Sequence, residues 1–364
     1  MSDDNSPQAK SGQAKTDENE TRMQEYRRPT LADVAESASV STATVSRFFS
    51  APDAVSPALR ARVDAAVTKL GYMPDASARA LVTGRTNTFG FVIPTLDVAT
   101  FAAGVQAFQS HLAGADYTSL LAYSNYDLAE EARQVRALIS RGVDGIVMVG
   151  IEHEPGLTDL LVERNVPFVN TWVFEPGTEY PCIGFDNREA MRRMGRYVLD
   201  MGHRDVALII GGLGDDNDRS RARVEGVQRA MAERGLTLPP ERIMKRKYSV
   251  TEGRDAFRQL MALPAPPTAI ICGSDVYAIG VMLECRRLGI TVPDEVSVSG
   301  FDDVEIARHL NPPLTTVNVP AIEMGRLAAE YLLARIGDQP AAKHTELDCM
   351  LSVRHSVAPP PVRT

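Results

Sequence analysis

Residues 30–49, TLADVAESASVSTATVSRFF, decide the fold of the N-terminal part of the chain. Thr30 is a good N-cap, and apolar residues then recur at i, i+3, i+4 and i+7 over Leu31–Ala38, which predicts a short one-sided helix. Ala38-Ser39-Val40 interrupts this pattern, and Ser41 caps a second predicted helix. Two short helices joined by a turn of about three to four residues are typical of a helix-turn-helix, whose second helix lies in the DNA major groove.

The second predicted helix has one face free for DNA, because Val45 and Phe48 face the small core. Arg47 could pair bidentately with guanine, and the methyl groups of Thr42 and Ala43 could contact thymine. Ser46 completes this face. A helical hairpin that only packs a core has the same pattern, so the stretch alone leaves DNA binding and core packing equally open.

The composition of the 364 residues, 44% hydrophobic and 24% charged, is ordinary for a globular protein of two or three domains. No apolar run approaches the roughly 18 residues of a membrane span, and the N-terminus lacks the apolar core of a signal peptide. The four cysteines lie far apart with no CxxC pair, which predicts neither a zinc site nor a disulfide framework. We therefore expect a cytoplasmic protein.

Charge is unevenly distributed along the chain, whose overall net charge is -8. Residues 27–85 contain eight Lys/Arg against five Asp/Glu, whereas residues 1–26 contain three against six. The candidate DNA-binding part is thus the only positive region, and its sign favours DNA as a partner.

The order of patterns along the chain predicts its domains. Residues 1–28 are too polar to bury a core and are predicted to be a disordered tail. Ser56-Pro57 and Gly71 bracket a third helical stripe, which completes a helix-turn-helix domain over residues 29–74. Residues 75–87 hold a helical fragment too short to be stable alone, predicted to be a hinge and linker. Residues 88–356 form the large domain, and 357–364 a tail.

Apolar strands alternate with amphipathic helices throughout the large domain. The predicted strands are 89–94, 118–122, 145–149, 167–170, 206–210, a strand near 243, 268–272 and 296–300, and the predicted helices are 104–113, 130–140, 157–164, 188–201, 221–234, 252–262 and 276–288. This alternation predicts an α/β fold with two doubly wound parallel sheets, in which ligands bind at the carboxyl ends of strands.

No motif predicts catalysis, a cofactor or a metal. The glycines of 211–214 lack the GxGxxG spacing, and CGSD at 272–275 is not a GxSxG elbow. The six histidines show no paired metal-ligand spacing. The polar residues that remain follow strands or open a helix, namely Asp186, Ser274-Asp275, Asp302-Asp303, Arg219, Arg221 and Arg223. Such side chains suit a polyhydroxy ligand, although each aspartate could instead cap a helix and Arg223 could lie on a solvated helix face.

The motifs, taken together, resemble the LacI/GalR family of transcriptional regulators over residues 29 to about 356. They are TLADVAESASVSTATVSRF, VSPALRARVDAAVTKLGYMPD, ASARALVTG, GFDN, MGHRDVALI, RSRARVEGV, GSDVYAIG, GITVPDEVSVSGFDD and NPPLTTV, in this order. The resemblance implies a periplasmic-binding-protein-like body of two subdomains with three crossovers, and an effector in the cleft between them.

The resemblance also implies a homodimer on a pseudo-palindromic operator. Residues 75–82 would form a hinge helix on specific DNA, with Leu81 wedged into the central base step. The candidate DNA contacts are Thr30, Ser41, Thr42, Ala43, Thr44, Ser46, Arg47, Ala78 and Leu81. Two residues depart from the family pattern, because Ser39 replaces a turn glycine and Asp75 replaces an asparagine. Both bear on DNA affinity.

For the effector, the resemblance implies that Arg223 anchors the ligand, Asp302 and Ser274 contribute polar contacts, and Tyr248 and Phe101 pack on it. Asp186 is a further candidate, and Trp172 fits cleft lining and structural packing equally well. VSRFF and LGYMPD lean toward the gluconate-regulator branch, and Arg219 with Arg221 would suit an anionic effector such as a sugar acid.

The leading hypothesis is a repressor of carbohydrate or sugar-acid catabolism genes that a small-molecule effector releases from DNA. A ligand that acts as corepressor is the alternative within the family. A solute-binding transport protein suits the body alone, but the helix-turn-helix argues against it. A sugar-metabolising enzyme lacks a catalytic constellation.

Overall fold

The computed structural model describes residues 27–74, 80, 84–212 and 217–362. The chain divides into two compact units, residues 1–84 and residues 85–364. The predicted disordered tail and hinge helix, including Asp75, Ala78 and Leu81, fall almost entirely outside the described residues. Among the described residues no helix is both long and apolar enough to cross a membrane.

The first unit contains the three predicted helices, α2 (Leu31–Ala38), α3 (Thr42–Ser50) and α4 (Pro57–Leu70). The predicted N-caps Thr30, Ser41 and Ser56 precede the three helices, and α4 ends before Gly71 as predicted, whereas α3 extends to Ser50, which was predicted to lie in the following loop. Val34, Val45 and Val63, one from each helix, are fully buried and form the centre of the core. Packing of three amphipathic helices around these valines fixes the angle at which α3 presents its outer face.

Ser39 ends α2 in the left-handed conformation, with φ 50° and ψ 51°. Its N–H donates to the Glu36 carbonyl, and that of Val40 donates to the Ala35 carbonyl. The guanidinium of Arg62 donates to the carbonyls of Ala38 (2.6 Å) and Ser39 (2.8 Å). The turn thus requires the positive φ that glycine tolerates best, and α4 supports the serine that stands there.

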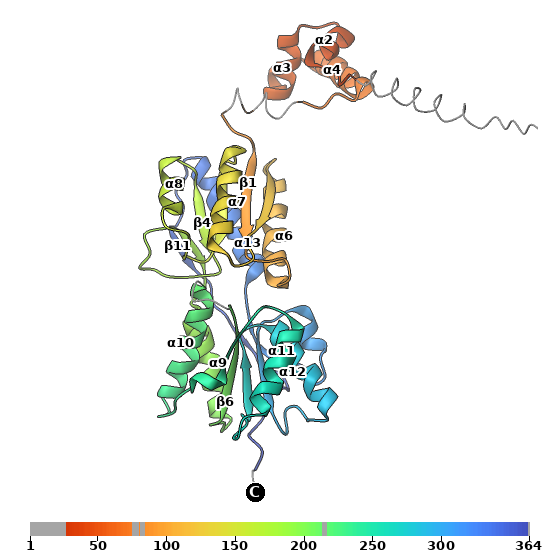
Figure 1. Cartoon of the computed structure of the whole chain (residues 1–364). Helices are drawn as coiled ribbons and strands as arrows, with labels where there is room; N and C mark the ends of the chain where they lie inside the picture. The colour runs from red at the N-terminus through yellow and green to blue at the C-terminus, as the bar shows by residue number, and fades with distance from the viewer. Residues whose placement is uncertain (1–26, 75–79, 81–83, 213–216, 363–364) are drawn as a thin grey trace, which may run out of the picture. The chain divides into compact units, whose positions relative to one another are not determined.

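The second unit has two lobes, each a six-stranded sheet between helices, as counted over the described residues (Figure 1). The first sheet has the order β11-β5-β4-β3-β1-β2 and the second the order β12-β10-β9-β8-β6-β7, all parallel except the β10–β12 pair. The strands of the first sheet are β1 (Thr88–Ile93), β2 (Thr118–Tyr123), β3 (Gly145–Val149), β4 (Phe168–Thr171), β5 (Cys182–Gly184) and β11 (His344–Glu346). Those of the second are β6 (Val206–Gly211), β7 (Ile243–Arg246), β8 (Ala269–Cys272), β9 (Ser297–Asp302), β10 (Thr315–Asn318) and β12 (Leu351–Ser352).

Helices cover both faces of each sheet. The first lobe has α6 (Ala99–Ala113), α7 (Leu128–Ser140), α8 (Leu157–Glu163) and α13 (Ala321–Ile336), and the second has α9 (Asn187–Asp200), α10 (Asp218–Ala232), α11 (Val250–Met261) and α12 (Asp275–Leu288). Successive residues of a strand point to opposite faces of the sheet and enter different hydrophobic cores, as Phe91 and Val92 of β1 do. Two buried faces explain why these strands are apolar runs.

The described chain crosses between the lobes three times, as the family resemblance implied. It leaves the first lobe between β5 and α9, returns between β10 and α13, and leaves again between β11 and β12. Five elements of the two lobes were not predicted from the sequence: β5, β10, α13, β11 and β12. β5, β11 and β12 have only two or three residues, but α13 has a helical stripe in Met324, Ala328 and Leu332 that would have predicted it.

Candidate functional site

The outer face of α3 carries the predicted DNA contacts. Thr42, Ala43, Ser46 and Arg47 are exposed, whereas Val45 is fully buried. Arg47 forms no ion pair with any acidic residue in the described part of the chain. The face therefore offers methyl groups, hydroxyls and one guanidinium of the kind that read base edges in the major groove.

Two of the predicted contacts, Ser41 and Thr30, also cap helices. The Ser41 hydroxyl accepts the Thr44 N–H at 3.1 Å and lies 2.9 Å from the Thr44 hydroxyl. The Thr30 hydroxyl accepts the Asp33 N–H, while Asp33 accepts the Thr30 N–H at 2.7 Å. Each cap uses one backbone N–H of the first turn, and the remaining N–H groups of a helix N-terminus can bind phosphate.

A small cavity of about 20 Å³ lies between the two lobes of the second unit. Its lining residues are Val98, Thr100, Phe101, Tyr126, Trp172, Arg219, Arg223, Tyr248 and Asp302. Six of the eight predicted effector residues are among them, drawn from α6, the end of β4, α10, the segment before α11 and the end of β9. The structure thus brings together residues up to 200 positions apart at the carboxyl ends of the strands.

Arg223 is held rigidly at this cavity. Its Nε donates to Asn187 Oδ1 at 2.9 Å and its Nη1 to the Gly273 carbonyl at 2.8 Å. The guanidinium carbon lies 3.7 Å from the centre of the Phe301 ring. A planar fork fixed on one side by hydrogen bonds and on another by an aromatic ring is preorganised to bind a ligand oxygen.

Ser274 lies behind the cavity and orients Asp302. Its hydroxyl donates to Asp302 Oδ2 at 2.8 Å and accepts the Val276 N–H at the start of α12. Asp302 itself has φ 123°, which is uncommon for a residue other than glycine and is typical of strained functional sites. Ser274 does not line the cavity and contacts this site through Asp302.

Two buried carboxyl groups share this end of β9. Burial raises the pKa of Asp302 to about 6, against the lowering effect of Arg223 and the Ser274 hydroxyl. Burial and the neighbouring Asp302 raise the pKa of Asp275 well above its ordinary value. Arg223 stabilises charge on Asp302, whereas no cation among the described residues is a main influence on the pKa of Asp275, so we assign the shared negative charge to Asp302.

Aromatic rings line much of the cavity. Phe101 packs on Trp172 with ring centres 5.1 Å apart, and Tyr126 stacks on Tyr248 at 4.9 Å and 11°. The Trp172 indole N–H is buried and has no hydrogen-bond partner among the described residues. Burial raises the pKa of Tyr126 well above its ordinary value, so its hydroxyl remains protonated. These walls suit the apolar face of a ring, and the indole can donate to an acceptor on it.

Tyr126 is one of three cavity residues, with Val98 and Thr100, that were not predicted from the sequence. It follows β2 in a loop where Asn125 and Tyr126 both have positive φ, 53° and 63°. Adjacent left-handed residues turn the ring toward the other lobe. Asparagine before it was the one available signal of such a turn.

Asp186 does not line the cavity. Its carboxylate accepts the N–H groups of Arg188 (2.8 Å) and Glu189 (3.0 Å) and caps α9, as the alternative in the sequence analysis had it. It lines a separate small cavity beside the crossover segments, with Glu346 and Asp348 among its neighbours.

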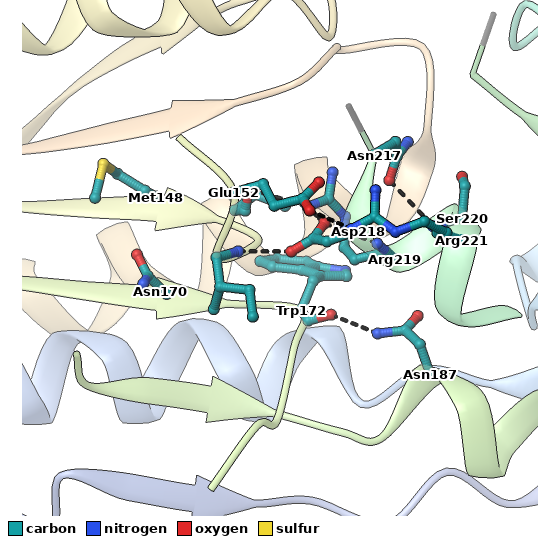
Figure 2. A network of polar contacts seen from close by, with 12 residues as sticks. Met148, Glu152, Asn170, Trp172, Asn187, Asn217, Asp218, Arg219, Ser220 and Arg221 are labelled. Atoms are coloured by element: carbon teal, nitrogen blue, oxygen red, sulfur yellow. Dashed lines mark hydrogen bonds and ion pairs between the residues drawn. The ribbon is translucent and has the colours of Figure 1, made fainter. Parts of the chain in front are cut away.

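The two further arginines of α10 are already paired. Arg219 lines the cavity, but its Nη1 donates to Asp218 at 2.7 Å and to the Val149 carbonyl at 3.1 Å (Figure 2). Arg221 lies outside the cavity and forms an ion pair with Glu152 of the first lobe. An anionic ligand would have to displace an acidic side chain to reach either charge.

Comparison with known proteins gives the family. Residues 30–75 match the model of bacterial regulatory proteins, lacI family, and residues 196–357 match the periplasmic binding protein-like domain. The chain is 31% identical to the HTH-type transcriptional repressor CytR of Escherichia coli over 90% of its length and 96% of the relative. The chain belongs to the LacI family.

A second LacI-family relative, the HTH-type transcriptional regulator GntR of E. coli, is also 31% identical, over 91% of this chain and 99% of GntR. Because the chain is equally identical to CytR and to GntR, the match to GntR supports the gluconate-regulator branch only weakly. A crystal structure of a LacI-family transcriptional regulator from Silicibacter pomeroyi superposes with a TM-score of 0.83 at 26% identity, covering 91% of this chain and 99% of that one. CytR and GntR are HTH-type transcriptional regulators, and the Silicibacter pomeroyi protein is a transcriptional regulator of the same family.

Proposed function

We propose that this LacI-family protein is a repressor of carbohydrate or sugar-acid catabolism genes, released from a pseudo-palindromic operator by a small-molecule effector. In this proposal residues 29–74 bind operator DNA and residues 88–356 bind the effector. Residues 75–87 form the hinge and linker that joins these two domains. The protein works on DNA in the cytoplasm. The observation that carries the proposal is the convergence of Arg223, Asp302 and four aromatic rings at one cavity between the lobes.

The chemistry of this cavity supports a polyhydroxy ligand. Asp302 accepts hydroxyl donors, Arg223 binds a ligand oxygen, and the rings cover the apolar face of a sugar. The indole N–H of Trp172 offers one further donor. Asp302, Arg223 and Trp172 are buried, so each makes a stronger hydrogen bond than it would in water.

The charges around the cavity favour an uncharged sugar over a sugar acid as the effector. Arg219 is paired with Asp218, and Arg223 stands beside Asp302. The two arginines are thus balanced by two aspartates, and neither positive charge is left over to pair with the carboxylate of a sugar acid. A sugar acid remains the second candidate, supported by the similarity to GntR.

Exposed apolar side chains support the homodimer. Leu120, Leu121 and Tyr123 are exposed on the edge strand β2, and Leu283 and Leu288 on α12. An apolar edge strand is a liability unless another chain covers it. A dimer also matches the two half-sites of a pseudo-palindromic operator.

The test is selection of binding sites from random duplex DNA by the purified full-length protein at about 150 mM salt, because phosphate contacts alone bind at low salt. We expect an enriched pseudo-palindrome bound roughly 10³-fold or more tighter than scrambled DNA. Recovery of DNA with no common sequence would overturn the proposal. Adding neutral sugars and sugar acids to the selected complex then identifies the effector, and tighter binding in place of release would make it a corepressor.

A further inference from the structure

The first turn of α10, in the second lobe, contacts the segment after β3, in the first lobe (Figure 2). The Ile151 N–H donates to Asp218 Oδ2 at 2.6 Å, and Arg219 Nη1 donates to the Val149 carbonyl at 3.1 Å. Arg221 and Glu152 form an ion pair at the rim. Three contacts from the first turn of α10 therefore connect the second lobe to the first without any ligand.

Asp218 is fully used in this contact. Its Oδ1 accepts both the N–H and the Nη1 of Arg219 at 2.7 Å, and its Oδ2 accepts the Ile151 N–H. The side chains of Asp218 and Arg219 are only 9% and 10% exposed. If the lobes separate, Asp218 loses its hydrogen bond to Ile151 and Arg219 loses its hydrogen bond to Val149. Leaving buried charged groups without these partners costs free energy, which favours the closed arrangement.

Gly150 shows that the two surfaces fit closely. It has φ +92°, and a Cβ at this position would overlap Arg219 Nη1 and come within 2.9 Å of both Asp218 carboxylate oxygens. No side chain larger than hydrogen fits between the segment and α10. Close approach of backbone and guanidinium is thus a feature of the closed arrangement.

A second bridge contains Tyr126 and Tyr248, stacked 4.9 Å apart. They come from the loop after β2 in the first lobe and the segment before α11 in the second. Both tyrosines and Arg219 line the cavity, so it lies between the two bridges. Opening the cavity to a ligand requires at least one bridge to break.

We propose that Asp218 and Arg219 form a clamp that closes the cleft on residues 149–152, and that Arg219 is a positioning residue and not a partner for the charge of a ligand. The clamp deepens the proposed function and rests on it for the meaning of the cleft. Its effect on closure is nevertheless a property of the protein alone. Because a ligand must work against the clamp, Asp218 sets how strongly the effector has to bind before the lobes move.

Trp172 is the chain's only tryptophan and is 2% exposed at the cavity, so its fluorescence reports cleft opening without DNA or effector. In the full-length protein we expect Asp218→Ala to raise the acrylamide quenching constant of Trp172 roughly threefold or more, as the open state becomes populated. The matched control is Arg234→Ala, which breaks the ion pair with Asp200 within the second lobe. This control should leave quenching unchanged.

Gly150→Ala tests the clamp from the opposite lobe and should raise quenching as Asp218→Ala does. The double variant should add little to either single variant, because both act on one contact. Thermal unfolding of each variant shows whether the protein is folded when quenching is read. Unchanged quenching in both folded single variants, or an equal rise in Arg234→Ala, would overturn the clamp. Loss of operator preference alone would overturn the proposed function and leave the clamp standing.

Discussion

The hydroxyl of Ser274 lies 2.8 Å from Oδ2 of Asp302, where neighbouring strands β8 and β9 end. The same serine caps α12, so the start of a helix and the orientation of a buried carboxylate depend on one side chain. The Ser274 hydroxyl and the positive charge of Arg223 both lower the pKa of Asp302 while burial raises it, so its protonation is a property of the whole site.

The first prediction concerns pH and Asp302→Asn. The folded-state pKa of Asp302, about 6, lies above its ordinary 3.8. The stabilisation from this carboxyl is therefore fully present below about pH 4 and is lost as pH rises through about 6. Relative to wild type, we expect the variant's free energy of unfolding to rise by about 1–3 kcal/mol between about pH 4.5 and 7.5. Denaturant unfolding at both pH values measures this, and a constant difference would contradict it.

A second prediction concerns Arg223→Lys. An ammonium has no planar fork to lie on Phe301 while donating to Asn187 and Gly273. We expect effector affinity, measured by release of the selected operator, to fall about tenfold or more, since a buried charge-assisted hydrogen bond contributes about 1.5–3 kcal/mol. Operator affinity without effector should be retained. Unchanged effector affinity would show that Arg223 is structural.

Ser39→Gly is predicted to stabilise the helix-turn-helix unit. Ser39 has φ 50°, which glycine adopts without steric cost. The gain should be about 0.5–1 kcal/mol, because glycine also loses more freedom on folding. Differential scanning calorimetry of the full chain would show it as an upward shift of the transition of this unit. Ser50→Gly, at the last residue of α3 in the same unit, should give no such upward shift.

Arg47→Ala is predicted to weaken binding to the selected operator by about 1–3 kcal/mol and to relax specificity at one base position. Arg28→Ala, which removes an exposed charge before α2, should weaken binding to all duplexes alike and reduce its salt dependence. Titration of both variants on operator and scrambled DNA at two salt concentrations separates these effects. If Arg47→Ala lowers the affinity for operator and for scrambled DNA equally, Arg47 contacts phosphate and not a base.

Local signals predicted the secondary structure well. Thr30, Ser41 and Gly71 each mark a helix boundary in the structure, because capping depends on neighbouring backbone groups alone. The alternation of apolar strands and amphipathic helices likewise predicted the parallel sheets. The short strands β5, β11 and β12 were missed because pairing partners, and not their own residues, define them.

The side-chain contacts between the two lobes could not be predicted from the sequence. Tyr126 and Tyr248 are 122 positions apart, and no local pattern pairs them. Arg219 opens an arginine-rich helix, which predicts a ligand contact. In the structure it lines the cavity and also donates to Asp218 and to the Val149 carbonyl of the opposite lobe, which no local pattern indicates. Only the packing of α10 against the segment after β3 reveals which charges are already balanced.

The threefold crossing of the chain has a consequence for its synthesis. The first lobe takes α13 and β11 from beyond residue 320, and the second takes β12 from residues 351–352. The ribosome must therefore complete almost the entire chain before either lobe has all its elements. The helix-turn-helix residues emerge first and can fold while the rest is still being made. A premature stop codon late in the gene would thus leave a DNA-binding head without a sensor to control it.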